Sequence, residues 1–255
     1  MQLIMYGDFN CPYSFLASQR AEALERLGHR VEWRAVEHDP HLSMTGTLSA
    51  ADADGWGCEL AEVAGLALTG EHVPTGAPGM ISNTYAATSA YAESLTDGVA
   101  GRLRRDLFNA IWMSGAHLSN AYDVRPLIAA LTFPRGPVGP WLGLERPRPG
   151  LGGPDPNQPT RMLGGTITPT GAPLTTTGWR RMTGWRRDWL ALGVPVLPAV
   201  AEPAGVVRFG VDALTWLAGL LPGQGTGARQ AIRRPPEPAN RMHLSGVLKN
   251  GLVAG

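Results

Sequence analysis

Residues 8–17 read Asp-Phe-Asn-Cys-Pro-Tyr-Ser-Phe-Leu-Ala and place Cys11 where a strand turns into a helix. The apolar run from Leu3 to Tyr6 is typical of a strand that is covered on both faces of a parallel sheet. Pro12 suits the first helical position, because its fixed φ fits a helix and the N–H that it lacks would have no partner there. The helix is predicted to end before Gly28.

A second strand is expected directly after this helix. Val31, Trp33 and Ala35 alternate with polar residues, which is the period of a strand with one polar face. Two strands joined by a helix form a βαβ unit, whose crossover is right-handed in almost all proteins. The chain therefore begins as an α/β fold.

The middle of the chain changes to a helical period. Between about residues 57 and 131 apolar residues recur every three to four positions, most clearly at Leu103, Leu107 and Ile111. This pattern predicts an all-helical insertion over residues 46–132. Residues 133–178 are dense in glycine and proline and are predicted to form a long loop with a small hairpin around Thr170-Gly171.

The last ordered part is expected over residues 179–221. An amphipathic helix starts at Trp179 and is predicted to bury Trp185 and Trp189, although arginines beside tryptophans also occur where bases stack. A short strand pair and a final helix follow, with Asp212 at the helix start. Residues 222–255 show no sustained period and predict a disordered tail, so truncation after Pro222 is expected to leave melting nearly unchanged.

Composition argues against several classes of partner. The formal net charge is +1, which provides no concentrated basic field for nucleic acid, and Lys249 is the only lysine, which excludes a Walker loop. The N-terminus lacks the basic and apolar segments of a signal peptide, and no apolar run is long enough to cross a membrane. The sequence thus predicts a cytoplasmic protein without nucleic-acid or membrane partners.

Cys11 is the strongest candidate for chemistry. At a helix start, backbone N–H groups and the helix dipole favour a thiolate, so we expect a lowered pKa and a nucleophile. The alternative is a small cysteine that only packs, and this alternative is favoured for Cys58. His38 and His41 lack further ligands at suitable spacing, so no metal site is predicted.

The segment around Cys11 resembles a family active site. It is similar to the Cys-Pro-Tyr-Cys site of DsbA-like thioredoxin-fold oxidoreductases and to the Ser-Pro-Tyr-Ser site of 2-hydroxychromene-2-carboxylate isomerases and class kappa glutathione transferases. Further stretches resemble the same group in the same order, and they are residues 105–112, 191–194, 197–200 and 209–214. The resemblance covers about residues 1–131 and 179–221.

The resemblance implies a thioredoxin fold formed by residues 1–45 and 179–221. It also implies a cis Leu197-Pro198 bond facing the cysteine, where Pro195 is the competing candidate. Catalytic roles are then carried over to Cys11, Ser14 and Pro198, and binding roles to Pro12, Tyr13, Leu197 and Asp212. An Asn83-Thr84 pair resembles one that opens an insertion helix in some relatives, but the residues after it differ.

Ser14 departs from the dithiol pattern. It stands where an oxidoreductase has its second cysteine, so a mixed disulfide on Cys11 must be released by another thiol. Glutathione, mycothiol or Cys58 could do this. The Ser14 hydroxyl either hydrogen-bonds a thiolate or supports the first helical turn.

Three functions are therefore consistent with the sequence. The first is a thiol-disulfide oxidoreductase that uses Cys11 and a small thiol cosubstrate. The second is a transferase-like or isomerase-like enzyme that activates the thiol of a cosubstrate. The third is a non-catalytic binding module. The expected partner is a small-molecule thiol or disulfide, and a homodimer is one option for the assembly.

Overall fold

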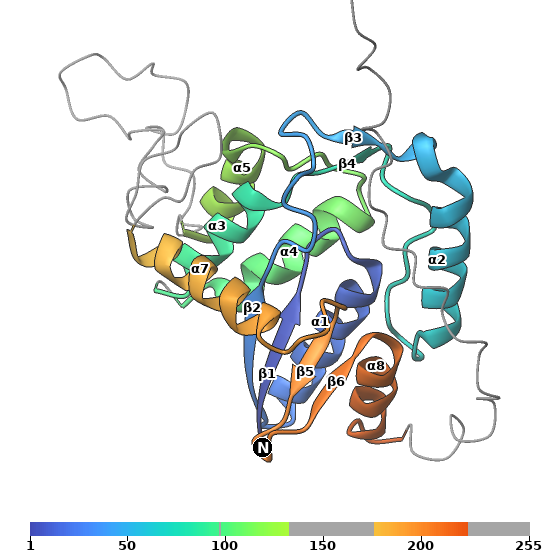
Figure 1. Cartoon of the computed structure of the whole chain (residues 1–255), viewed down its shortest axis with the longest axis vertical. Coiled ribbons are helices and arrows are strands. Elements are labelled where there is room, and N and C mark those ends of the chain that lie inside the picture. The colour runs from blue at the N-terminus through green and yellow to red at the C-terminus, as the bar shows by residue number, and fades with distance from the viewer. Residues whose placement is uncertain (97, 133–175, 224–255) are drawn as a thin grey trace, which may run out of the picture.

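The N-terminal βαβ unit forms as predicted. The structure, a computed structural model, describes residues 1–96, 98–132 and 176–223 (Figure 1). Strand β1 (Gln2–Gly7) leads into helix α1 (Pro12–Arg26), and β2 (Arg30–Ala35) lies parallel to β1. Strand β1 ends at Gly7, next to the indole of Trp33. A Cβ atom at this position would lie 2.3 Å from the Trp33 ring. The chain therefore needs glycine just before the turn that carries the cysteine.

The C-terminal elements complete the sheet on the other side of β1. Strand β5 (Ala199–Ala201) runs antiparallel to β1, and β6 (Val207–Phe209) runs antiparallel to β5, which gives the order β2-β1-β5-β6. Helix α8 (Gly210–Gly219) follows β6 and packs on α1. This arrangement of βαβ and ββα units is the predicted thioredoxin fold.

Helices dominate the insertion between β2 and the C-terminal elements. Leu103, Leu107 and Ile111 are fully or almost fully buried, as the helical period predicts. One short antiparallel ladder joins the helices, so the insertion is not all-helical. Its elements are β3 (Thr47–Leu48), η1 (Ser49–Asp52), α2 (Ala53–Leu66), β4 (Met80–Ile81), α3 (Tyr85–Ser94), α4 (Ala100–Trp112) and α5 (Ala121–Thr132).

Helix α7 (Thr176–Leu190) links the insertion to the sheet. It begins three residues before the expected start at Trp179, and it lies against α3 and β2 (Figure 1). Trp185 and Trp189 are buried, with the Trp185 ring 6.0 Å from that of Tyr91. The predicted packing of this tryptophan stripe is therefore confirmed.

Two predictions concern segments outside the described residues. They are the hairpin around residues 170–171 with most of its long loop, and the tail beyond residue 223. Within the described ranges, no helix combines the length and apolar character that a membrane crossing needs.

Candidate active site

The sulfur of Cys11 lies at the head of α1. Cys11 is the N-cap residue, and the Ser14 backbone N–H donates to its Sγ over 3.4 Å. The Cys11 N–H in turn donates to the Asp8 carbonyl at 3.1 Å, which closes the turn between strand and helix. On the opposite side, the thiol donates to the Leu197 carbonyl with Sγ and O 4.0 Å apart. The Leu197–Pro198 peptide bond is cis, as predicted for this position rather than for Pro195.

The expected lowering of the Cys11 pKa is wrong for this site. Burial raises the pKa of the thiol to about 12, although hydrogen bonds from the Ser14 side chain and backbone act in the opposite direction. The negative charges of Glu59 and Asp8 raise it further. The helix start supplies hydrogen-bond donors that stabilise a thiolate, but the cost of removing a charged sulfur from water is larger than this stabilisation. The resting site therefore holds a thiol.

Ser14 supports the turn and is also a hydrogen-bond partner of Cys11. It is fully buried, and its hydroxyl accepts the Asp8 N–H at 3.3 Å, which supports the turn. It also supplies the hydrogen bonds that favour ionised Cys11. Pro12 is buried at the first helical position, and the hydroxyl of half-buried Tyr13 donates to the Glu62 carboxylate on α2.

Asp8 connects the turn to two other segments, and sequence reasoning missed it. Its Oδ1 accepts the Asn10 N–H at 3.1 Å and the Thr84 hydroxyl at 2.8 Å. Its Oδ2 accepts the His38 N–H at 2.9 Å and lies 2.6 Å from His38 Nδ1. These bonds hold the pKa of the buried carboxyl below its usual range, and Asp8 raises the pKa of His38. The available signal was an acidic residue directly after a buried strand.

The insertion holds the cysteine turn in place from its other side. Besides the Thr84 hydroxyl, the Asn10 amide donates to the Ser82 carbonyl, and the Trp112 indole donates to the Phe9 carbonyl at 2.8 Å. Of the Asn83-Thr84 pair, Thr84 thus contacts the cysteine turn, whereas Asn83 bonds to Leu42, Tyr85 and Ser119. The site depends on contacts between segments that are far apart in the chain.

A cavity of about 650 Å³ opens beside Cys11. Tyr13, His38 and Leu197 line it together with the cysteine. The other walls come from the segment after β2, from β3, η1, α2 and β4, and from residues 195–196. Pro198 is buried and is not among the lining residues. The structure therefore brings together the cysteine, the tyrosine and the backbone of the cis-proline loop.

Two sequence candidates lie away from this cavity. Asp212 is in the first turn of α8, where its side chain is 68% exposed and lies 3.4 Å from Arg208. Cys58 is exposed on α2 and does not line the cavity, and both cysteines are free thiols. Asp212 has no contact in the described structure that would give it a binding role at Cys11.

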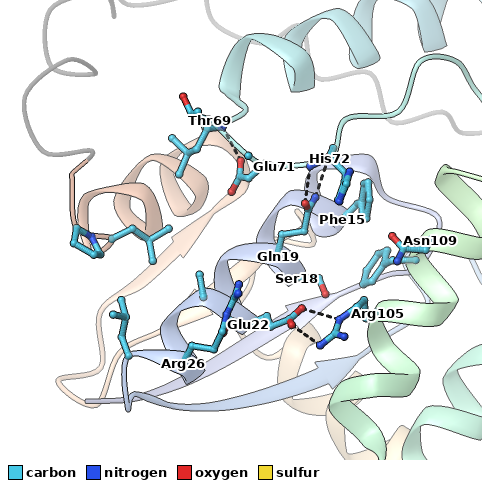
Figure 2. Close-up of a pocket in the computed structure, with 17 residues that line it drawn as sticks. Phe15, Ser18, Gln19, Glu22, Arg26, Thr69, Glu71, His72, Arg105 and Asn109 are labelled. Atoms are coloured by element: carbon cyan, nitrogen blue, oxygen red, sulfur yellow. Dashed lines mark hydrogen bonds and ion pairs between the residues drawn. The ribbon is translucent and has the colours of Figure 1, made fainter. Parts of the chain in front are cut away.

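A second cavity of about 700 Å³ lies on the outer side of α1 (Figure 2). It contains no cysteine, and two of its carboxylates are held in ion pairs, Glu22 with Arg105 and Glu71 with Arg20. Figure 2 shows the Glu22 carboxylate bound to Arg105 and the Gln19 amide bound to the His72 backbone. Because the resemblance concerns a cysteine and neither cysteine lines this second cavity, the candidate site is assigned to the cavity at Cys11. No group of three or more metal-ligating side chains occurs in the described ranges.

The Asp8–His38 pair predicts a pH dependence of stability. The raised His38 pKa adds stability below about pH 6.5 that is lost as the pH rises, and the lowered Asp8 pKa adds stability above about pH 4 that is lost as the pH falls. We expect His38→Gln to lower the free energy of unfolding most near pH 5.5 and less at pH 9. The effect should stay below about 1 kcal/mol, because the His38 side chain is 45% exposed. Urea titrations at both pH values measure it, and an equal loss in the control His41→Gln would contradict the assignment.

Comparison with known proteins supports the fold. No family model and no curated protein sequence matches the chain. Among solved structures, a 2-hydroxychromene-2-carboxylate isomerase matches with a TM-score of 0.56 and 17% identity, over 86% of this chain and 94% of the isomerase. A probable DsbA oxidoreductase from Streptomyces coelicolor matches with a TM-score of 0.55 and 14% identity, over 93% of each chain. The cytosolic disulfide reductase DsbM from Pseudomonas aeruginosa matches with a TM-score of 0.50 and 16% identity, over 86% of this chain and 97% of the reductase.

Fold and site together define a thioredoxin-fold protein with one cysteine at the head of its first helix. Within that class, the chain has the fold shared by DsbA-like oxidoreductases and 2-hydroxychromene-2-carboxylate isomerase, as its sequence resemblance implies. At identities this low the likeness concerns the fold, so the chemistry has to be argued from the site.

Proposed function

We propose that the protein is a thiol-disulfide oxidoreductase that uses Cys11 as its single nucleophile. The position of the sulfur carries this proposal. Cys11 Sγ borders the cavity, receives the Ser14 N–H at 3.4 Å and faces the Leu197 carbonyl. A disulfide in the cavity can approach the sulfur while its backbone or amide groups pair with the Leu197 loop.

Each half of the proposed cycle is balanced. The Cys11 sulfur attacks one sulfur of the substrate disulfide, and the departing sulfur takes the thiol proton. This step forms a mixed disulfide and one free thiol. A second small thiol then attacks the adduct, restores Cys11 as a thiol and leaves as part of a new disulfide. No second enzyme cysteine is needed, and Cys58 does not line the cavity.

The raised pKa favours a second candidate function as well. At neutral pH the Cys11 thiol is a hydrogen-bond donor, as is the serine in the Ser-Pro-Tyr-Ser motif that the segment resembles. Cys11 could therefore donate to the thiolate of a bound cosubstrate instead of attacking. The enzyme would then be transferase-like or isomerase-like, and one of the solved structures of similar fold is named as an isomerase.

Adduct formation across pH tests the nucleophile. We expect the Cys58→Ser variant to gain one adduct at Cys11 when it is exposed to bis(2-hydroxyethyl) disulfide, as measured by intact mass and peptide mapping. Because burial raises the Cys11 pKa to about 12, the rate should keep rising from pH 7 to pH 10. For a thiol with an ordinary pKa, the rate of adduct formation would level off above about pH 8.5. If no adduct forms at Cys11 anywhere in this range, the oxidoreductase proposal is wrong.

The physiological cosubstrate, a cytoplasmic location and a homodimer stay predictions of the sequence. Glutathione and mycothiol are both candidates for the small thiol at this stage. The DsbM structure is described as a cytosolic disulfide reductase, which is compatible with the predicted compartment.

A further inference from the structure

The wall of the Cys11 cavity is acidic. Its lining includes the carboxylates of Asp39, Asp52 and Glu59. Among the described lining residues there is no lysine or arginine, and the cationic candidate, His38, is already paired with Asp8. Most of the remaining side chains in the wall are apolar, including Leu42, Leu48, Trp56, Ile81 and Leu197.

The negative charge acts on the position where a substrate sulfur would react. Burial is the largest cause of the raised pKa of Cys11 and Tyr13, and the charge of Glu59 raises both further. The same charge adds to the effect of Asp8 in raising the pKa of His38. All three shifts favour the less negative form of the group. Glu59 therefore influences the reacting sulfur and both neighbouring lining residues. A cleft with low-dielectric walls and one sign of charge concentrates such a field, and this changes the local concentration of charged substrates.

We propose that this cavity selects disulfides and thiols that are uncharged or cationic near the reacting sulfur and discriminates against anionic ones. This inference rests on the proposed exchange at Cys11. Glutathione carries one net negative charge at neutral pH, and no arginine or lysine of the described lining offers its carboxylates a partner. Mycothiol, whose body is a neutral sugar conjugate, belongs to the favoured class.

Three small disulfides that differ in charge test the selection. They are cystamine, which is cationic, bis(2-hydroxyethyl) disulfide, which is neutral, and 3,3′-dithiodipropionate, which is anionic. The rate of adduct formation at Cys11 is measured by intact mass on the full chain carrying Cys58→Ser. Each rate is divided by the rate of the same disulfide with N-acetylcysteinamide, which removes differences in intrinsic reactivity. We expect the cationic disulfide to exceed the anionic one by roughly 10-fold at low ionic strength, with a smaller ratio in 0.5 M salt.

Charge-removing variants assign the effect to the cavity wall. We expect Glu59→Gln to lower the ratio of cationic to anionic rates by about threefold, and Asp39→Asn to act in the same direction. The matched control is Asp54→Asn, an equal charge change at an exposed position of α2 that does not line the cavity. The ratio is informative even if a variant alters the Cys11 pKa, because both rates use the same thiol.

The outcomes separate this inference from the proposed function. Adducts that form with no preference for cationic disulfides overturn the selection and leave the exchange at Cys11 in place. A change in Asp54→Asn as large as that in Glu59→Gln also overturns it, because the field would then not come from the wall. If none of the three disulfides forms an adduct, the exchange itself is refuted and the selection falls with it.

Discussion

Cys11→Ser is expected to abolish adduct formation with any disulfide and to reduce disulfide turnover by at least about 1000-fold, because no other sulfur is found among the described residues that line the cavity. The replacement puts a hydroxyl donor of similar size in the place of the thiol at the head of α1. Stability should therefore change little, and a thermal melt of the variant checks this. Cys58→Ser serves as the matched control and should retain both adduct formation and turnover, since Cys58 is exposed and outside the cavity.

The same variant separates the two candidate functions. If Cys11 acts only as a donor to the thiolate of a cosubstrate, Cys11→Ser keeps activity and Cys11→Ala loses it. If Cys11 is the nucleophile, both variants are inactive. Full turnover of disulfide by Cys11→Ser would therefore contradict the oxidoreductase proposal and favour the transferase-like or isomerase-like one.

Arg20→Met is expected to produce the largest loss of stability. The Arg20 side chain is 1% exposed on α1, and its guanidinium binds both oxygens of Glu71 at 2.8 and 2.9 Å. It also donates to the carbonyls of Leu214 in α8 at 2.6 Å and Leu66 at the end of α2 at 2.7 Å. One cation thus ties the thioredoxin core to the insertion. Removing it leaves a nearly buried carboxylate without its partner, which costs about 3–5 kcal/mol.

Thermal and urea unfolding measure this loss. A decrease of that size corresponds to a melting temperature lower by roughly 6–20 °C for a domain of this length. Arg26→Met, at an exposed position of the same helix, should change the free energy of unfolding by less than about 0.5 kcal/mol. The double variant Arg20→Met with Glu71→Met should recover part of the loss, because no unpaired buried charge remains. Equal destabilisation by Arg26→Met would contradict the role given to Arg20.

The sequence by itself determined the elements that depend on local pattern. The βαβ unit follows from the alternation at Val31, Trp33 and Ala35 and from the helix that starts at Pro12, because period and caps are properties of neighbouring residues. The α4 face with Leu103 and Leu107 was predictable for the same reason. The position of Cys11 at a helix start was also predictable, since a proline after a strand marks the first helical turn.

Only the tertiary structure decided the chemistry of that cysteine. A helix start alone favours a thiolate, but the Leu197 loop and the insertion cover the sulfur, and burial then outweighs the local donors. The link from Asp8 to Thr84 and His38 and the acidic wall with Glu59 likewise arise from segments distant in the chain. Solvation and electrostatic field are sums over all neighbours in space, so a sequence pattern specifies where the nucleophile lies but not how readily it ionises.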